Sequence, residues 1–205
     1  MIHIVDYGVG NIASLVNMLD HLGVDACATG DQAKIAGASH LILPGIGAFD
    51  HAMRELGTRA LVAPLHQAAT DGAHMLGVCL GMQLLGRGSE EGSLPGLGLI
   101  EADVVRLPAT GIDGERLAVP NIGWHMLDKP FGSPLFNDPA RDERFYFVHS
   151  FRMTCDDPDD VAGTIMRGSE AVTVAVSRGN LHGVQFHPEK SHRYGMRVLQ
   201  AFAEL

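Results

Sequence analysis

Apolar residues in the first hundred positions alternate between short continuous runs and stretches with helical spacing. Residues 2–5 are an apolar run, and positions 12, 15, 16 and 19 lie on one face of a helix that Asn11 would cap and Gly23 would end. The same reasoning predicts strands at 24–28, 40–43 and 74–78 and helices at 80–85 and at 49–70, the latter interrupted near Gly57. Apolar strands alternating with helices indicate a mostly parallel sheet covered on both faces.

The second half of the chain has short β-rich segments separated by turns. We expect strands there at 99–107, 117–121, 144–151, 162–166, 172–177 and 181–186. They predict antiparallel strands that extend the sheet, followed by a C-terminal helix that buries Met196, Leu199 and Phe202. With 205 residues and no repeat or low-complexity linker, we expect one domain over 1–205.

Composition and charge narrow the class of protein. Hydrophobic residues make up 46% and charged residues 19% of the chain. The net charge of −9 argues against nucleic acid or an anionic membrane as a partner. Three widely spaced cysteines exclude a disulfide framework. The chain starts without a signal peptide and has no apolar run long enough to span a bilayer, so we expect a cytoplasmic enzyme or binding domain.

Cys79 has the sequence context of a nucleophile. It is the centre of a Gly-Val-Cys-Leu-Gly segment (77–81) where a predicted strand turns into a predicted helix. This is the thiol version of the nucleophile elbow, whose glycines permit a strained turn. The following helix N-terminus favours a thiolate and supplies backbone N–H groups to an oxyanion. Cys27 and Cys155 lack this context and are expected to act as small apolar residues.

His187 is the histidine best placed to act as the base for Cys79. It ends an apolar strand and precedes a proline, and Glu189 lies two residues further on. In an extended segment these two side chains point to one side, so Glu189 can orient the imidazole while its other nitrogen faces the thiol. A metal cluster of His182, His187 and His192 is the alternative, but no ligand set with suitable spacing completes it.

Five motifs together resemble a known family. The segments 77–85 and 186–189 are similar to the class I (triad) glutamine amidotransferases. The segments 6–11, 43–49 and 119–124, the last with 147–150, narrow the resemblance to the glutaminase subunits of imidazole glycerol phosphate synthases, along the whole chain. The resemblance implies a flavodoxin-like α/β fold with a mixed, mostly parallel sheet, helices on both faces and a β-rich C-terminal half.

The resemblance also implies an activity and a partner. The chain would hydrolyse L-glutamine and pass ammonia to a HisF-like (β/α)₈-barrel subunit that makes imidazole glycerol phosphate and an aminoimidazole ribotide, without a cofactor or metal. The implied roles are a triad of Cys79, His187 and Glu189; an oxyanion hole at Gly45, Ile46, Gly47 and Leu80; glutamine binding by Gln83, Glu91, His149 and Ser150; and a partner interface at Trp124, Asn121 and Lys190. A carboxylate at Glu91 suits the α-ammonium of glutamine, although a solvated charge in that loop is the competing interpretation.

Three alternatives stay open at the level of sequence. Asn121 and Phe151 replace the family's usual His and Tyr, and residues 189–196 look closer to a paralogous branch that supplies ammonia for sugar amidation in surface-polysaccharide synthesis. A cysteine hydrolase of the peptidase or deglycase kind would use the same elbow but would need no role for 44–47 or Glu91. A catalytically idle scaffold subunit would not need the intact Cys79, His187 and Glu189 set.

Overall fold

The computed structural model describes residues 1–128, 133–136 and 142–205. Within them, the main sheet has seven strands in the order β10-β11-β12-β4-β3-β1-β2. The pairs that link β2, β1, β3, β4 and β12 are parallel, and β11 and β10 continue the sheet in antiparallel pairing. The strand bounds are β1 (Ile2–Val5), β2 (Ala26–Thr29), β3 (His40–Gly45), β4 (His74–Cys79), β10 (Val161–Arg167), β11 (Glu170–Arg178) and β12 (Leu181–Val184).

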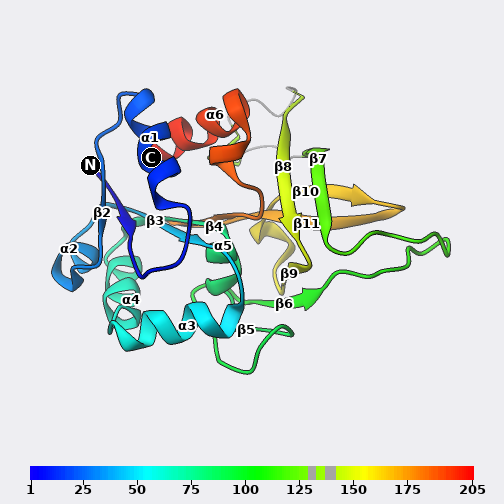
Figure 1. Cartoon of the computed structure of the whole chain (residues 1–205), viewed down its shortest axis with the longest axis horizontal. Helices are drawn as coiled ribbons and strands as arrows, with labels where there is room; N and C mark the ends of the chain where they lie inside the picture. The colour runs from blue at the N-terminus through cyan, green and yellow to red at the C-terminus, as the bar shows by residue number, and fades with distance from the viewer. Residues whose placement is uncertain (129–132, 137–141) are drawn as a thin grey trace.

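Helices cover both faces of this sheet, as the sequence predicted (Figure 1). One face carries α1 (Ile12–His21) and α6 (His192–Ala203), and the other carries α3 (Phe49–Thr58), α4 (Val62–Thr70) and α5 (Leu80–Leu84). The short α2 (Gln32–Ala36) packs against α4. None of the helices in the described part of the chain combines the length and apolar character needed to cross a lipid bilayer.

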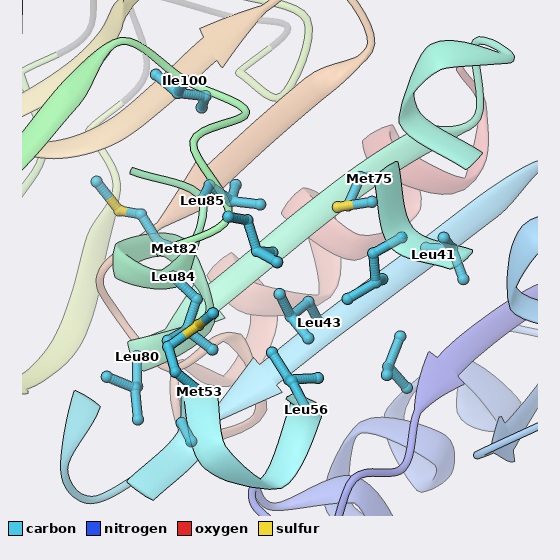
Figure 2. Packing of buried hydrophobic residues seen from close by; sticks show 14 of the residues in the cluster. Leu41, Leu43, Met53, Leu56, Met75, Leu80, Met82, Leu84, Leu85 and Ile100 are labelled. Carbon is cyan, nitrogen blue, oxygen red and sulfur yellow. The ribbon is translucent and has the colours of Figure 1, made fainter. Parts of the chain in front are cut away.

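The two faces bury two separate hydrophobic clusters because side chains alternate along each strand. In β3, Leu41 and Leu43 belong to the cluster beneath α3, α4 and α5, whereas Ile42 belongs to the cluster beneath α1 and α6. Figure 2 shows part of the first cluster, in which Leu56 of α3 lies beside Leu43 of β3 and Leu80 of α5 lies near Met53 of α3. Apolar strands were therefore a correct indication of a sheet that is buried on both sides.

The β-rich half departs from the prediction, because only part of it joins the main sheet. A three-stranded sheet is formed by β5 (Gly88–Ser89), β6 (Ala102–Arg106) and β9 (Phe151–Cys155), and a two-stranded sheet by β7 (Asn121–Met126) and β8 (Arg144–His149). The segment expected at 181–186 pairs antiparallel with β11, as expected, but it pairs in parallel with β4 on its other side, which places its carboxyl end beside that of β4. Strand direction depends on a non-local partner, so the local pattern could not supply it.

Several element boundaries also differ from the prediction. The strand expected at 117–121 begins only at Asn121, where pairing with β8 starts. The strand expected at 144–151 is two strands that separate at Ser150, since β8 and β9 pair with different partners. Helix α2, which Asp31 caps through its side chain, was not predicted because its five residues are too few to show a helical period. The helix break expected near Gly57 lies at 59–61, and α1 ends before Gly23 as expected.

The glycines of the elbow allow α5 to pack directly on β3 and β4. A Cβ atom at Gly81 would overlap the carbonyl oxygen of Leu43, and one at Gly77 would lie 2.6 Å from the carbonyl oxygen of Gly81. Such distances are far below van der Waals contact with backbone atoms that cannot move aside. The glycines are therefore required by packing between backbones, which fixes where Cys79 lies.

We predict that Gly81→Ala destabilises the protein by more than about 3 kcal/mol, because the added methyl group would push α5 away from β3. The matched control is Gly57→Ala, where a Cβ meets nothing within 4 Å in a helix. Gly57→Ala should raise the free energy of unfolding by roughly 0.5–1 kcal/mol. Urea unfolding of both variants measures the two effects, and a mild cost at Gly81 would contradict the close-packing account.

Three histidines form a stacked row on the α6 side of the sheet, away from the elbow. The ring centroids of His40 and His74 are 5.3 Å apart and those of His74 and His182 are 6.0 Å apart, with Phe202 edge-on to the outer two. Ser177 hydrogen-bonds His182 Nδ1 at 2.9 Å, while each ring keeps one buried nitrogen without a partner in the described residues. Burial, and then the neighbouring His74, lower the pKa of His182 to about 4. His182 is therefore neutral at physiological pH.

We predict that acid destabilises the protein through His182. An unfolded histidine has a pKa of about 6.5, so the unfolded state binds the proton first as pH falls. The stabilisation from neutral His182 is present above about pH 6.5 and is lost as pH falls towards about 4. The free energy of unfolding, measured with urea between pH 7 and pH 4, should depend less steeply on pH in His182→Gln than in the wild type. His51→Gln, at an exposed position, should leave this pH dependence unchanged. Equal slopes in all three proteins would contradict this.

Candidate active site

Cys79 lies at a sharp turn between β4 and α5. It has φ 55° and ψ −111°, a conformation that non-glycine residues rarely adopt, and its side chain is 8% exposed. Because β3, β4 and β12 are parallel, their carboxyl ends meet at one edge, where Gly45 is in register with Cys79. The elbow predicted from the sequence therefore presents the thiol at that edge.

The thiol opens into a cavity of about 350 Å³. This volume suits a small polar metabolite. Its wall comes from β4 and α5, from the segments after β3 and β12, and from the ends of the small sheets. The lining residues are Ile46, Gly47, Cys79, Leu80, Gln83, Glu91, Pro120, Val148, His149, Ser150, Phe151, Gln185 and His187.

His187 and Glu189 form the buried pair that the sequence predicted. The Nδ1 atom of His187 lies 2.8 Å from Oε1 of Glu189, and both side chains are less than 5% exposed. Burial by itself lowers the pKa of His187, but hydrogen bonds with Cys79 and Glu189 outweigh it and raise the pKa to about 9. His187 therefore carries a proton at neutral pH and hydrogen-bonds both the Cys79 sulfur and the Glu189 carboxylate.

The segment after β3 forms the wall of the cavity opposite His187. Ile46 and Gly47 line the cavity, and Gly47 has a φ of +82°. The Tyr7 hydroxyl donates to the carbonyl oxygen of Pro44 at 2.6 Å and so anchors the segment from below. Burial, and then Cys79, raise the pKa of Tyr7 above its usual range, so Tyr7 stays a donor. Gly45 is different from its neighbours: it packs on α5 and does not line the cavity.

Gln83 and Glu91 both line the cavity, as expected for binding residues. The Oε2 atom of Glu91 accepts the backbone N–H of Phe49 at 2.8 Å, which leaves Oε1 for another partner. Asp50 completes a reciprocal arrangement, because its carboxylate accepts the N–H groups of Ser93 and Leu94 at 3.0 Å. The loop that carries Glu91 is thereby tied to the start of α3, while the Glu91 residue itself remains exposed.

His149 and Ser150 line the cavity where β8 and β9 separate. His149 donates from Nδ1 to the carbonyl oxygen of Phe151 at 2.8 Å, so its Nε2 accepts from the Asn121 amide at 3.0 Å. Burial lowers the pKa of His149 to about 4, which keeps the ring neutral. Asn121 is only 6% exposed and acts on His149 from within the protein, whereas the sequence had indicated a surface position for it.

The other residues singled out from the sequence lie outside the cavity. Trp124 is 44% exposed and stacks on His192, with ring centroids 5.6 Å apart, and the Lys190 ammonium lies 5.9 Å from the Tyr146 ring. Burial raises the pKa of Cys155 to about 11, consistent with an unreactive thiol. Within the described residues, no group of three or more His, Cys, Asp or Glu side chains is arranged to hold a metal ion.

The sequence analysis missed Gln185, whose amide nitrogen lies 3.8 Å from the sulfur of Cys79. A signal was available, because Gln185 is two residues before His187 at the end of the strand predicted over 181–186, where alternate residues are expected to point to the same side. Pro120 and Phe151 were also missed as lining residues. Their position depends on how the two small sheets sit against the main sheet, which no local pattern reveals.

Comparison with known proteins agrees with this geometry. Residues 3–204 match the family model described as glutamine amidotransferase class-I. A Pseudomonas aeruginosa protein named imidazole glycerol phosphate synthase subunit HisH 2 is 44% identical over the full length of both chains. A Synechococcus elongatus protein named imidazole glycerol phosphate synthase subunit HisH is 42% identical over 98% of this chain and 91% of its own length. The chain belongs to the class-I glutamine amidotransferase family, within which its full-length relatives carry the HisH name.

Solved structures share the fold at low sequence identity. A Thermotoga maritima structure titled PurLQS superposes with a TM-score of 0.74 at 21% identity, covering 99% of this chain and 97% of that chain. A crystal structure titled glutamine amidotransferase gives a TM-score of 0.73 at 19% identity, covering 98% and 97%. These matches confirm the predicted α/β fold with its mixed, mostly parallel sheet.

We predict that Glu189→Gln lowers the pKa of His187 by roughly one unit or more, because a neutral amide no longer stabilises the imidazolium. NMR titration of the histidine ring protons measures the shift, with the exposed Glu204→Gln as control. The protonated ring stabilises the fold fully below about pH 6.5, and this stabilisation is lost as pH rises through about 9. The loss of folding stability at alkaline pH should therefore be smaller in Glu189→Gln. An unchanged pKa of His187 in this variant would contradict the pairing of His187 with Glu189.

Proposed function

We propose that this chain is the glutaminase subunit of an imidazole glycerol phosphate synthase. It hydrolyses L-glutamine to glutamate and ammonia and passes the ammonia to a (β/α)₈-barrel subunit, which makes imidazole glycerol phosphate and aminoimidazole carboxamide ribotide in histidine biosynthesis. The observation that carries the proposal is the buried contact of Cys79 with the His187–Glu189 pair at the wall of the cavity. The names of the full-length relatives support the choice of synthase.

The reaction divides into two balanced steps at Cys79. The Cys79 thiolate attacks the side-chain carbonyl carbon of glutamine, and protonated His187 gives its proton to the departing nitrogen as the carbon–nitrogen bond breaks. Ammonia leaves and a thioester remains. Water then attacks the thioester, His187 takes the water proton, and the carbon–sulfur bond breaks to release glutamate and restore the thiolate. Glu189 keeps the imidazole oriented through both steps.

The remaining cavity residues supply charge stabilisation and recognition. Backbone N–H groups of Ile46 and Gly47, and of Leu80 at the start of α5, hold the negative oxygen of each tetrahedral intermediate. The free Oε1 of Glu91 binds the α-ammonium of glutamine, since its other oxygen is held by Phe49. Gln83 and the backbone at 149–150 complete the glutamine site.

An exposed apolar strip on β7 and β8 supports a partner-binding role. Ile122, Trp124 and Met126 alternate on one face of β7 and are 44–59% exposed, and Val148 of β8 is 37% exposed. Contiguous exposed apolar side chains around an aromatic anchor are typical of protein interfaces. Val148 also lines the cavity, so a barrel subunit on this strip would cover the cavity mouth and receive ammonia without release to solvent.

We predict that the wild-type chain, expressed with the barrel subunit from its own genome, restores growth without histidine to a strain that lacks both synthase subunits. Cys79→Ala should restore growth only with high ammonium, because the barrel subunit can use free ammonia. In the purified complex this variant should lose glutamine-dependent synthesis by a factor on the order of 10³ or more. Cys27→Ala, which changes a cysteine outside the cavity, is the matched control.

Three outcomes of this experiment would contradict the proposal, each in a different way. Glutamine hydrolysis by the complex without growth would overturn the histidine-pathway assignment and favour a sugar-amidating acceptor. Absence of glutamine hydrolysis by the wild-type complex would overturn the glutaminase assignment and favour another cysteine hydrolase or an idle subunit. Glutamine turnover in Cys79→Ala would remove Cys79 from the mechanism.

A further inference from the structure

Gln185 is a fully buried amide with both ends engaged. It follows the last residue of β12, is 0% exposed and lies beside Cys79 because Val184 is in register with Val78. Its Nε2 atom is 3.8 Å from the Cys79 sulfur, and its Oε1 atom accepts from Nε2 of Gln83 at 2.8 Å. A buried amide is costly unless it is hydrogen-bonded, so both contacts matter for the stability of this arrangement.

The chemistry of the groups fixes the direction of the two hydrogen bonds that connect Cys79, Gln185 and Gln83. The end of Gln185 that faces the Cys79 sulfur is the NH₂ group, which donates to the sulfur as acceptor. The Gln185 oxygen then faces Gln83, which has to donate to it. The Gln83 oxygen is therefore the atom left to accept from a ligand in the cavity, which Gln83 lines.

Gln185 and His187 contact the same sulfur but differ in what they can do there. His187 carries a transferable proton, as its raised pKa indicates, whereas an amide N–H does not ionise at neutral pH. A donor of this kind stabilises the thiolate before attack and again when the thioester is hydrolysed and the thiolate leaves. Its contribution is therefore electrostatic and needs no proton transfer.

We propose that Gln185 is a catalytic residue that stabilises the Cys79 thiolate with its NH₂ group and, through its oxygen, holds the Gln83 amide so that the Gln83 oxygen faces the substrate. The second role rests on the glutaminase function proposed above. The first role depends only on the contact with sulfur. One residue thereby links the reactivity of the nucleophile to recognition of a substrate that presents N–H donors.

The test measures the rate of Cys79 alkylation by iodoacetamide from pH 5 to pH 10 in the full chain bound to its barrel subunit, with Cys79 identified by peptide mass spectrometry. Gln185→Glu places a negative charge beside the sulfur and should raise the pH midpoint of alkylation by about one unit or more. Gln185→Met, which has a similar volume and no donor, should raise it by less. Gln32→Glu, the same substitution at an exposed site on α2, should leave the midpoint unchanged.

The steady-state kinetics separate the two roles. Both Gln185 variants should raise KM for glutamine about three- to tenfold, the loss expected from one net hydrogen bond, and should also lower kcat. Gln83→Met should raise KM to a similar extent while the alkylation midpoint stays at the wild-type value, because its contact with Cys79 is indirect. If Gln185 acted through packing alone, its substitution would leave the pH midpoint of alkylation at the wild-type value. The Gln185 and Gln83 variants would then not differ in that midpoint.

Wild-type midpoints in both Gln185 variants would overturn the proposal. Thermal unfolding shows which variants are folded, and Gln185→Met decides the question if the buried charge of Gln185→Glu prevents folding. A wild-type chain that fails to hydrolyse glutamine would overturn the proposed function. Alkylation requires no glutamine, so the shifts of its pH midpoint would still test the contact between Gln185 and the Cys79 sulfur. A midpoint that moves equally in Gln83→Met would assign the effect to the cavity as a whole and reject a direct role for Gln185.

Discussion

Close packing of the start of α5 against the ends of β3 and β4 is the constraint on which the site depends. Gly77 and Gly81 leave no room for a side chain, because the facing atoms are backbone of Leu43 and of the turn itself. The helix therefore begins directly above the sheet edge, and Cys79 is forced into a positive φ between strand and helix. The strained nucleophile is a consequence of this packing, and the surrounding core holds it in place.

The parallel direction of β12 brings the other half of the chemistry to the same edge. Residues that follow β12 pass beside Cys79 because β12 and β4 run together, and alternate positions of that segment supply Gln185 and His187. An antiparallel β12 would have carried these residues to the opposite edge. One choice of strand direction thus joins a nucleophile from the first half of the chain to a base from the second.

Environment gives different proton affinities to histidines of the same chain. His187 holds a proton because its hydrogen bonds with the Cys79 sulfur and the Glu189 carboxylate outweigh its burial, while burial keeps His149 and His182 neutral, each with a pKa of about 4. The neutral ring of His149 accepts from Asn121 and shapes the cavity wall, and that of His182 packs within a stacked row. Of these three histidines, His187 alone has both a carboxylate and the Cys79 sulfur as hydrogen-bond partners, which favours its protonated form and equips it to donate a proton.

The sequence by itself determined the elements with strong local signals: the first four strands, α1, α3 to α6, the elbow at Cys79 and the pairing of His187 with Glu189. Each depends on side-chain period, glycine positions or close spacing along the chain, although Glu189 reaches His187 from the 3-10 turn Pro188–Lys190 and not from the extended segment that the spacing argument assumed. The tertiary structure decided the direction of β12, the separation of β8 from β9 and the burial of Asn121. It also brought Gln185 to the sulfur, because contacts between residues about a hundred positions apart depend on which strands become neighbours, and a local pattern carries no information about that choice.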